Sequence, residues 1–197
     1  MTALQEAELQ LLELTQKVAR LRKDSEPVPV KNYTFTDTDG EVSLLNLFGN
    51  REVLFVIHNM GQGCRFCTLW ADGLNGFVPH VESQYAFVLV SKDAPQIQRN
   101  MSNSRNWRFK MASHGGGEYI QQQSVFAGET NTPGMVCYLR KGDEIFRKNS
   151  VAFGPGDEFC PQWNLLSLAG IDEPEWFPQF NYWKRPEVMD DGGEYLD

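Results

Sequence analysis

The chain has 197 residues, a formal net charge of −8 and an isoelectric point near 4.9. This length is enough for one domain with a sizeable hydrophobic core, and a 41% share of hydrophobic residues is typical of a globular protein rather than a disordered one. The acidic balance argues against nucleic acids and anionic membranes as partners, because phosphates are bound by clustered Lys and Arg, and no apolar run approaches the ~18 residues of a membrane helix.

Residues 3–22 are predicted to form an amphipathic helix. Its apolar residues recur in steps of three and four, as in a heptad repeat. They are Leu4, Ala7, Leu11, Leu14, Val18 and Leu21. Three heptads are at the short limit for a coiled coil, so the helix packs either against its own domain or against a second copy. Residues 24–29 contain Pro27 and Pro29, which end the helix and form a linker or an extended edge segment. We therefore predict that residues 1–23 form an N-terminal helix separate from the domain that follows.

From residue 33 on, strand-like and helical segments alternate. Two unbroken apolar runs, residues 53–57 and 86–90, suit strands that are covered on both faces. A helix is expected after each run, from the cysteine pair to about Val81 and from Ala94 to about Trp107. The other expected elements are strands at 33–36 and 109–112, a short apolar element at 42–48, a hairpin of 134–140 and 144–153, and a last helix at 161–168.

This order predicts one α/β domain over residues 30–170. A strand–helix–strand unit implies a right-handed crossover and parallel pairing, and the late hairpin adds antiparallel strands. The expected architecture is a mixed central β-sheet with helices on both faces.

Cys64 and Cys67 stand three residues apart at the start of the first of these helices, directly after a buried strand. This spacing brings two sulfurs within disulfide range. The free N–H groups of a helix N-terminus stabilise a thiolate at the first cysteine, and Arg65 is expected to act in the same direction. We predict that Cys64 is the exposed nucleophile and that Cys67 is the resolving thiol.

Two alternatives to a redox pair remain open: a pair kept on the fold without dithiol turnover, and a metal site. Structural zinc takes four ligands, commonly from two such pairs or from one pair with two closely spaced histidines. The sequence offers only isolated further candidates, which are His58, His80, His114, Cys137 and Cys160. Cys137 lies in an apolar strand and is interpreted as a buried small hydrophobic residue. No organic cofactor and no metal is expected.

Two further places support the cysteine pair. His58 ends the strand that leads to the cysteines, and it either tunes the Cys64 thiolate or only hydrogen-bonds backbone. Thr132 and Pro133 precede the hairpin. A proline that enters a strand there suits a cis bond, which exposes the preceding backbone to an extended partner; a simple loop proline is the alternative.

The cysteine motif after a buried strand, together with Thr132 and Pro133 before the hairpin, resembles the thioredoxin superfamily. The long second half is similar to the peroxiredoxin branch, and residues 63–73 and 76–80 resemble a bacterial family of thioredoxin-like proteins of unassigned function. The resemblance covers about residues 1–170. It implies a thioredoxin-like fold with Cys64 and Cys67 as the redox pair and with Pro133 as the cis-proline that follows Thr132.

Two departures from these families limit what the resemblance implies. The PxxxTxxC pattern of peroxiredoxins is absent before Cys64, which puts peroxidase chemistry of that kind in doubt. Between the cysteines, Arg65 and Phe66 stand where thioredoxin has Gly and Pro. The redox potential and the partner surface of thioredoxin therefore do not transfer to this chain.

Residues 171–197 are expected to form an irregular, acidic extension that packs across its own domain or a neighbouring subunit. Its aromatic residues are Trp176, Phe177, Phe180, Tyr182 and Trp183. A homodimer through the N-terminal helix or through this extension is expected.

The sequence as a whole predicts a cytoplasmic thiol–disulfide oxidoreductase. The N-terminus lacks the basic start and apolar stretch of a secretory signal, and four cysteines are too few for a disulfide scaffold. The substrate would be a protein or small-molecule disulfide or thiol. The competing hypothesis is a thioredoxin-fold binding or scaffold protein without redox turnover.

Overall fold

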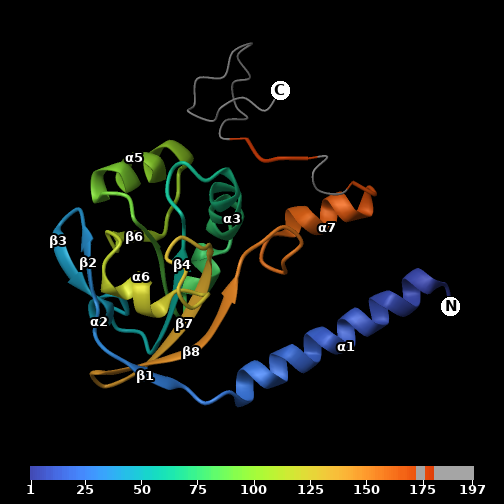
Figure 1. Cartoon of the computed structure of the whole chain (residues 1–197), viewed down its shortest axis with the longest axis horizontal. Helices are drawn as coiled ribbons and strands as arrows, with labels where there is room; N and C mark the ends of the chain where they lie inside the picture. The colour runs from blue at the N-terminus through green and yellow to red at the C-terminus, as the bar shows by residue number, and fades with distance from the viewer. Residues whose placement is uncertain (172–175, 180–197) are drawn as a thin grey trace, which may run out of the picture.

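The computed structural model describes residues 1–171 and 176–179 (Figure 1). Within this part, eight strands form one sheet in the order β1-β8-β7-β4-β5-β6-β2-β3. The strands are β1 (Val28–Val30), β2 (Thr34–Asp37), β3 (Gly40–Ser43), β4 (Val53–His58), β5 (Ala86–Ser91), β6 (Lys110–Ser113), β7 (Gly134–Lys141) and β8 (Glu144–Ala152). The helices are α1 (Ala3–Asp24), α2 (Leu44–Leu47), α3 (Arg65–Asn75), α4 (Val78–Glu82), α5 (Pro95–Arg105), α6 (Glu118–Gln123) and α7 (Pro161–Leu168).

The centre of the sheet confirms the predicted mixed topology. β4 pairs in parallel with β5, and β5 with β6, whereas β7 is antiparallel to β4 and to β8. β4 and β5 are the two unbroken apolar runs of the sequence, and they occupy the middle of the sheet, where both faces are covered. The chain therefore has the thioredoxin-like mixed α/β fold that its sequence predicts.

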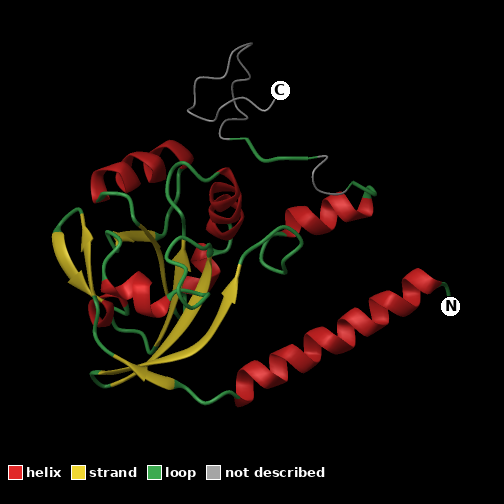
Figure 2. Ribbon diagram, in the orientation of Figure 1, coloured by secondary structure: helices red, strands yellow, loops and turns green. Residues whose placement is uncertain are grey.

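Helices lie on both faces of the sheet (Figure 2), and a separate hydrophobic cluster packs on each face. One cluster includes Leu54 and Val56 of β4 and side chains of α2 and α6. The other includes Ile57 of β4 and side chains of α3, α4 and α7. Successive side chains of β4 therefore point to opposite faces, as the pleat of a strand requires.

Both edges of the sheet come from the N-terminal part of the domain. Residues 24–29, expected as a linker or an edge segment, lead into β1, which pairs with β8. β2 and β3 form a hairpin at the other edge, where Thr36 of β2 pairs with Ser113 of β6.

The prediction of one helix from the cysteine pair to Val81 is wrong in one respect, because the segment forms two helices. α3 ends at Asn75 and α4 begins at Val78, with Gly76 between them and Pro79 in the first turn of α4. A glycine weakens a helix and a proline is accepted only in its first turn, so the chain restarts there.

α6 is an element that the sequence analysis did not predict. It follows a loop with three glycines at positions 115–117, and its N-cap is Gly117. Six residues are too few to show a helical period, although Tyr119, Ile120 and Gln123 are all buried.

α1 extends away from the sheet instead of lying along its own domain (Figure 1). None of its residues is buried, and Thr2 and Gln5 form a capping box at its start. Among the described residues, the last turn of α1 is the part that hydrogen-bonds to the sheet. There the side chain of Asn149 donates to the Arg22 carbonyl at 3.0 Å, and the Lys148 ammonium donates to the Lys23 carbonyl at 2.8 Å.

Most of the predicted C-terminal extension, residues 172–175 and 180–197, lies outside the described residues. This includes the aromatic residues Phe180, Tyr182 and Trp183. In the part of the chain that is described, no helix is both long and apolar enough to cross a membrane.

Candidate redox site

The cysteine motif follows a short loop at the end of β4. The backbone N–H of Asn59 donates to the carbonyl of Val90 at 2.9 Å, which ties the start of this loop to β5. The side chain of Asn59 accepts the N–H of Gly61 at 2.7 Å, and Cys64 N–H donates to the carbonyl of Gly61 at 3.1 Å. The loop is therefore a folded turn that delivers Cys64 to the start of α3.

Asp93 holds this loop from the β5 side. Its carboxylate accepts the N–H of Gln62 at 2.7 Å. A Cβ on Gly61 would lie only 2.8 Å from both carboxylate oxygens, and the φ of Gly61 is +107°, so no other residue fits at position 61 without strain. The sequence analysis missed Asp93, because its only signal is that it follows a buried strand.

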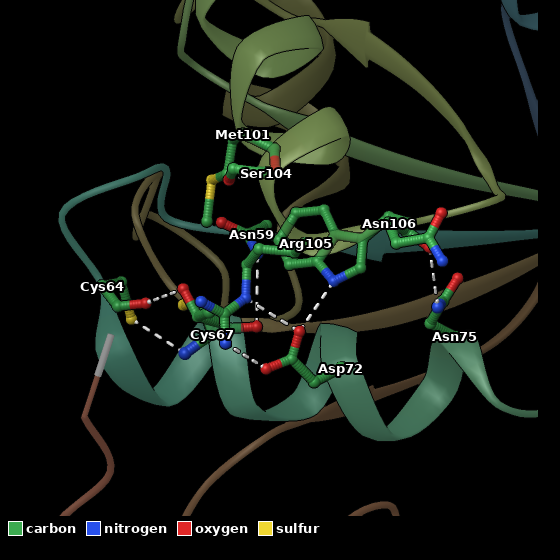
Figure 3. Close-up of polar contacts among 11 residues, drawn as sticks. Asn59, Cys64, Cys67, Asp72, Asn75, Met101, Ser104, Arg105 and Asn106 are labelled. Carbon is green, nitrogen blue, oxygen red and sulfur yellow. Dashed lines mark hydrogen bonds and ion pairs between the residues drawn. The ribbon is translucent and has the colours of Figure 1, made fainter. Parts of the chain in front are cut away.

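Cys64 is the N-cap of α3 and is half-buried. The backbone N–H of Cys67 donates to the Cys64 sulfur at 3.1 Å (Figure 3). The pKa of Cys64 is lowered from 9.0 to about 7, first by the hydrogen bond from the Cys67 thiol and then by the backbone N–H groups of Cys67 and Phe66, while burial opposes these effects. Hydrogen bonds to the sulfur stabilise its charged form, so Cys64 is the more acidic thiol of the pair.

Cys67 has the opposite character. It is buried, and its sulfur accepts the N–H of Met60 at 3.4 Å. The pKa of Cys67 is raised above its ordinary value by the hydrogen bond to Cys64, by burial and by the charge of Cys64. The pair therefore consists of a thiolate-forming cysteine at the surface and a protonated thiol beneath it.

The carboxylate of Asp72, a residue of α3, connects this helix to neighbouring elements. Asp72 accepts hydrogen bonds from Arg105 Nε at 2.9 Å and from Trp107 Nε1 at 2.8 Å, and it also forms an ion pair with the Arg105 guanidinium (Figure 3). One turn on, the side chain of Asn75 donates to the carbonyl of Asn106 at 3.2 Å and accepts the N–H of Arg108 at 2.8 Å. These contacts connect the helix that carries the cysteines to α5 and to the segment between α5 and β6.

Aromatic rings surround the sheet-facing side of α3. Trp70 stacks on Phe153 with ring centroids 5.4 Å apart, and Phe66 lies 6.2 Å from Trp163 of α7. Phe177, from the described part of the C-terminal extension, meets Phe66 edge-on at 6.2 Å. Phe177, in the described segment 176–179, therefore packs beside the cysteine motif.

A pocket of about 620 Å³ opens beside Cys64. Its lining combines apolar side chains with two cationic groups and one carboxylate. The lining residues are Met60, Gly63, Cys64, Arg65, Phe66, Lys92, Asp93, Asn131, Phe177 and Pro178. The predicted supporting residue Arg65 thus lies at this pocket, although it is not among the groups that lower the pKa of Cys64.

His58 is placed away from the cysteine pair. Ile57 packs in the cluster of α3, so the next side chain of β4 points to the other face, where His58 Nε2 lies 2.8 Å from the hydroxyl of Tyr119 on α6. Burial lowers the pKa of His58 to about 3. Neither interpretation of His58 fits: its Nε2 partner is a tyrosine side chain, and the imidazole does not face α3.

Thr132 and Pro133 lie where β7 begins, next to the end of β4. Gly134, which follows them, pairs with His58 in the sheet, and the carbonyl of Pro133 accepts the N–H of Phe153 at 2.9 Å. The Thr132 hydroxyl donates to Glu129 at 2.9 Å. Their neighbour Asn131 lines the pocket at Cys64, so the topology brings the segment before β7 close to the cysteine motif.

The other cysteines do not join the pair. Cys160 is buried at the N-cap position of α7, and Cys137 is half-buried in β7, where burial raises its pKa to about 11. Among the described residues, no group of three or more His, Cys, Asp or Glu side chains is arranged to hold a metal ion.

Comparison of the sequence with protein families gives a match over residues 1–186 to DUF899, described as a bacterial protein of unknown function. The match spans most of the chain, and the chain belongs to this family. The predicted resemblance to a bacterial thioredoxin-fold family of unassigned function is thereby confirmed. No curated protein matches the chain.

Solved structures with a similar fold include peroxiredoxins. Peroxidoxin BcpB from Mycobacterium tuberculosis is 15% identical, with a TM-score of 0.54, and the match covers 76% of this chain and 99% of that one. Peroxiredoxin Q from Xanthomonas campestris is 12% identical, with a TM-score of 0.54, and the match covers 70% of this chain and 88% of that one. At these identities the similarity establishes the fold, and the chemistry has to be argued from the residues of this chain.

Proposed function

We propose that this DUF899 protein is a thiol–disulfide oxidoreductase that acts through Cys64 and Cys67. The observation that carries the proposal is the asymmetry of the pair: the pKa of Cys64 is lowered to about 7, whereas the pKa of Cys67 is raised. About half of Cys64 is then thiolate at neutral pH, and the thiolate is the form that attacks disulfides.

In the first step, the Cys64 thiolate attacks one sulfur of a substrate disulfide. The substrate S–S bond breaks, one substrate thiolate leaves with the electron pair, and a mixed disulfide joins Cys64 to the other half. Cys67 then gives up its proton to solvent, attacks the Cys64 sulfur and releases the second substrate thiolate. The protein is left with a Cys64–Cys67 disulfide, and the substrate has gained two electrons. A thiol reductant restores the dithiol.

The order of these steps follows from how the two thiols affect each other. The hydrogen bond to Cys64 and the charge of Cys64 are two of the causes that raise the pKa of Cys67. Both disappear once the Cys64 sulfur is bound in a mixed disulfide, so the pKa of Cys67 falls at that point. Cys67 therefore becomes a nucleophile only when there is a mixed disulfide to resolve.

The substrate would be a protein or small-molecule disulfide or thiol that reaches the pocket at Cys64. Its apolar walls and the cationic groups of Arg65 and Lys92 support binding of a ligand with both apolar and anionic parts. The backbone before Pro133 is proposed to pair with an extended substrate. Thr132 and Arg65 are proposed as supporting residues, whereas His58 is not.

Peroxide reduction is not part of this proposal. The similar solved structures include peroxiredoxins, but they share the fold at 12–15% identity, and the PxxxTxxC pattern does not precede Cys64. The residues that precede Cys64 here are fixed by Asp93 and by the side chain of Asn59.

The second candidate function is a binding protein without redox turnover. The specific observation in its favour is α1, whose leucines are left exposed by the part of the chain that the structure describes. Cytoplasmic localisation and the absence of a cofactor remain predictions for either function.

Equilibration in glutathione redox buffers separates the two functions. For an oxidoreductase, mass spectrometry of alkylated protein finds a reversible disulfide that joins Cys64 to Cys67, with one midpoint potential. A binding protein leaves both thiols alkylatable across the same range of buffers. The matched control is Cys137→Ser, which leaves the midpoint unchanged because Cys137 lies outside the pair.

A further inference from the structure

α1 presents an apolar stripe that the described part of the chain leaves uncovered. The stripe consists of the six heptad residues Leu4, Ala7, Leu11, Leu14, Val18 and Leu21. Its leucines are 56–69% exposed. Most helical stability in proteins comes from packing of an apolar face, so we expect a partner that covers this stripe.

We propose that the stripe pairs with the same stripe of a second copy, in an antiparallel two-helix coiled coil. Spacing of three and four residues, kept over three heptads, is the geometry that lets two helices interlock their side chains. The stripe is self-complementary when the helices oppose each other, because Leu4 then meets Leu21, Ala7 meets Val18 and Leu11 meets Leu14 of the other copy. Toward each end of the pair, the small Ala7 of one copy thus faces the β-branched Val18 of the other.

The attachment of α1 to its own domain favours the antiparallel orientation. Val18 and Arg22 are the partly covered residues of this helix, and Arg22 lies 3.7 Å from Glu158 in an ion pair. The domain therefore crowds the C-terminal end of the stripe. A parallel partner would bring a second domain to the same end, whereas an antiparallel partner places the N-terminal turn of its helix there.

Charges beside the stripe favour the same orientation. In a parallel pair, the heptad places Lys17 of one copy against Arg22 of the other, which are like charges. In an antiparallel pair, Lys17 meets Gln10, and Glu8 meets Thr15. No like-charged pair then flanks the stripe, and the opposed helix dipoles attract each other.

Light scattering on the full chain at micromolar concentrations tests the pairing. We expect twice the chain mass of 22.5 kDa for the wild type. The double variant Leu11→Glu, Leu14→Glu is expected to give the single mass, and Leu9→Glu the double mass. Leu9 is the matched control, because it is 50% exposed but lies on the opposite side of α1 from the stripe. Since no residue of α1 is buried, circular dichroism is expected to find the domain folded in all three.

Two results would overturn the pairing: a monomeric wild type, or a dimer that survives in the Leu11→Glu, Leu14→Glu variant. The second result would mean that copies associate elsewhere, for example through residues 180–197.

Orientation is tested by oxidative cross-linking in a Cys64→Ser background. A mixture of Leu4→Cys and Leu21→Cys chains is expected to give a disulfide-linked dimer, because these positions meet in the antiparallel pair. Leu4→Cys chains alone are expected to remain uncross-linked. A cross-linked Leu4→Cys homodimer would overturn the antiparallel arrangement.

Discussion

The backbone N–H of Cys67 points at the sulfur of Cys64 across 3.1 Å, and the Cys67 thiol hydrogen-bonds the same sulfur. One residue thus supplies two of the interactions that favour a Cys64 thiolate, one from the helix backbone and one from its side chain. Because only the second depends on the side chain, substitution of Cys67 separates the two.

Cys67→Ala is expected to raise the pKa of Cys64 by about one unit, since the largest cause of its lowered value is the Cys67 thiol. Cys67→Ser keeps a hydroxyl donor and is expected to raise it less. The rate of Cys64 alkylation against pH, with the label located by mass spectrometry, measures both midpoints. Equal midpoints in the wild type and in Cys67→Ala would mean that the thiol contributes nothing.

Gly61→Ala is expected to reduce the alkylation rate of Cys64 at pH 7. A Cβ at position 61 meets the Asp93 carboxylate at 2.8 Å, and the φ of +107° is strained for any residue other than glycine, so the loop that delivers Cys64 has to move. Gly63→Ala is the matched control, because a Cβ there meets nothing within 4 Å. If both variants react at the wild-type rate, the loop does not position Cys64.

Asp72→Ala is expected to lower the free energy of unfolding by about 1–2 kcal/mol, because it leaves Arg105 and Trp107 without this partner; the ion pair is partly exposed, which keeps the value low. For a chain of this size, each kcal/mol shifts the melting temperature by about 2–4 °C. Thermal unfolding followed by circular dichroism measures the shift. Asp72→Asn retains a hydrogen-bond acceptor and should lose less; a larger loss in Asp72→Asn than in Asp72→Ala would refute this role.

The stability of the chain is expected to fall as the pH decreases from 6.5 toward 4. Burial lowers the pKa of His58 to about 3 and that of His114 to about 4, so in this range the unfolded chain binds protons at these positions that the folded chain does not. Each such histidine contributes a slope of up to about 1.4 kcal/mol per pH unit. Urea unfolding at pH 7, 6 and 5 measures the slope. His58→Gln, which does not titrate, should have a shallower slope, and an unchanged slope would show that His58 is not buried in its neutral form.

The central part of the fold was predictable because its signals are local. The apolar runs of β4 and β5, the cysteine spacing at the start of α3 and the turn between β7 and β8 each occupy adjacent positions in the chain. Hydrophobic pattern and turn residues are strong over such segments. The helix break at Gly76 also has a local signal, the glycine itself. Two short helices and one long helix share most of their periodicity, however, so the apolar pattern does not distinguish them.

The surroundings of the cysteines were less predictable, because they come from residues far apart in the sequence. Asp93 contacts a loop some thirty positions earlier, and His58 finds its partner on α6, 61 positions later. Neither contact leaves a periodic signal. The face of β4 on which the His58 side chain lies depends on the register of the strand. A shift of the register by one residue would place this side chain on the opposite face.

The most direct test of dithiol chemistry is the reaction of the reduced Cys67→Ser variant with oxidised glutathione, followed by mass spectrometry. This variant is expected to stop at a mixed disulfide on Cys64, whereas the wild type passes through the same adduct and ends as a Cys64–Cys67 disulfide. Cys64→Ser is predicted to form no adduct in the same time. A mixed disulfide that persists equally in the wild type, or an adduct that forms on Cys137 of the variant in place of Cys64, would contradict dithiol chemistry at this pair.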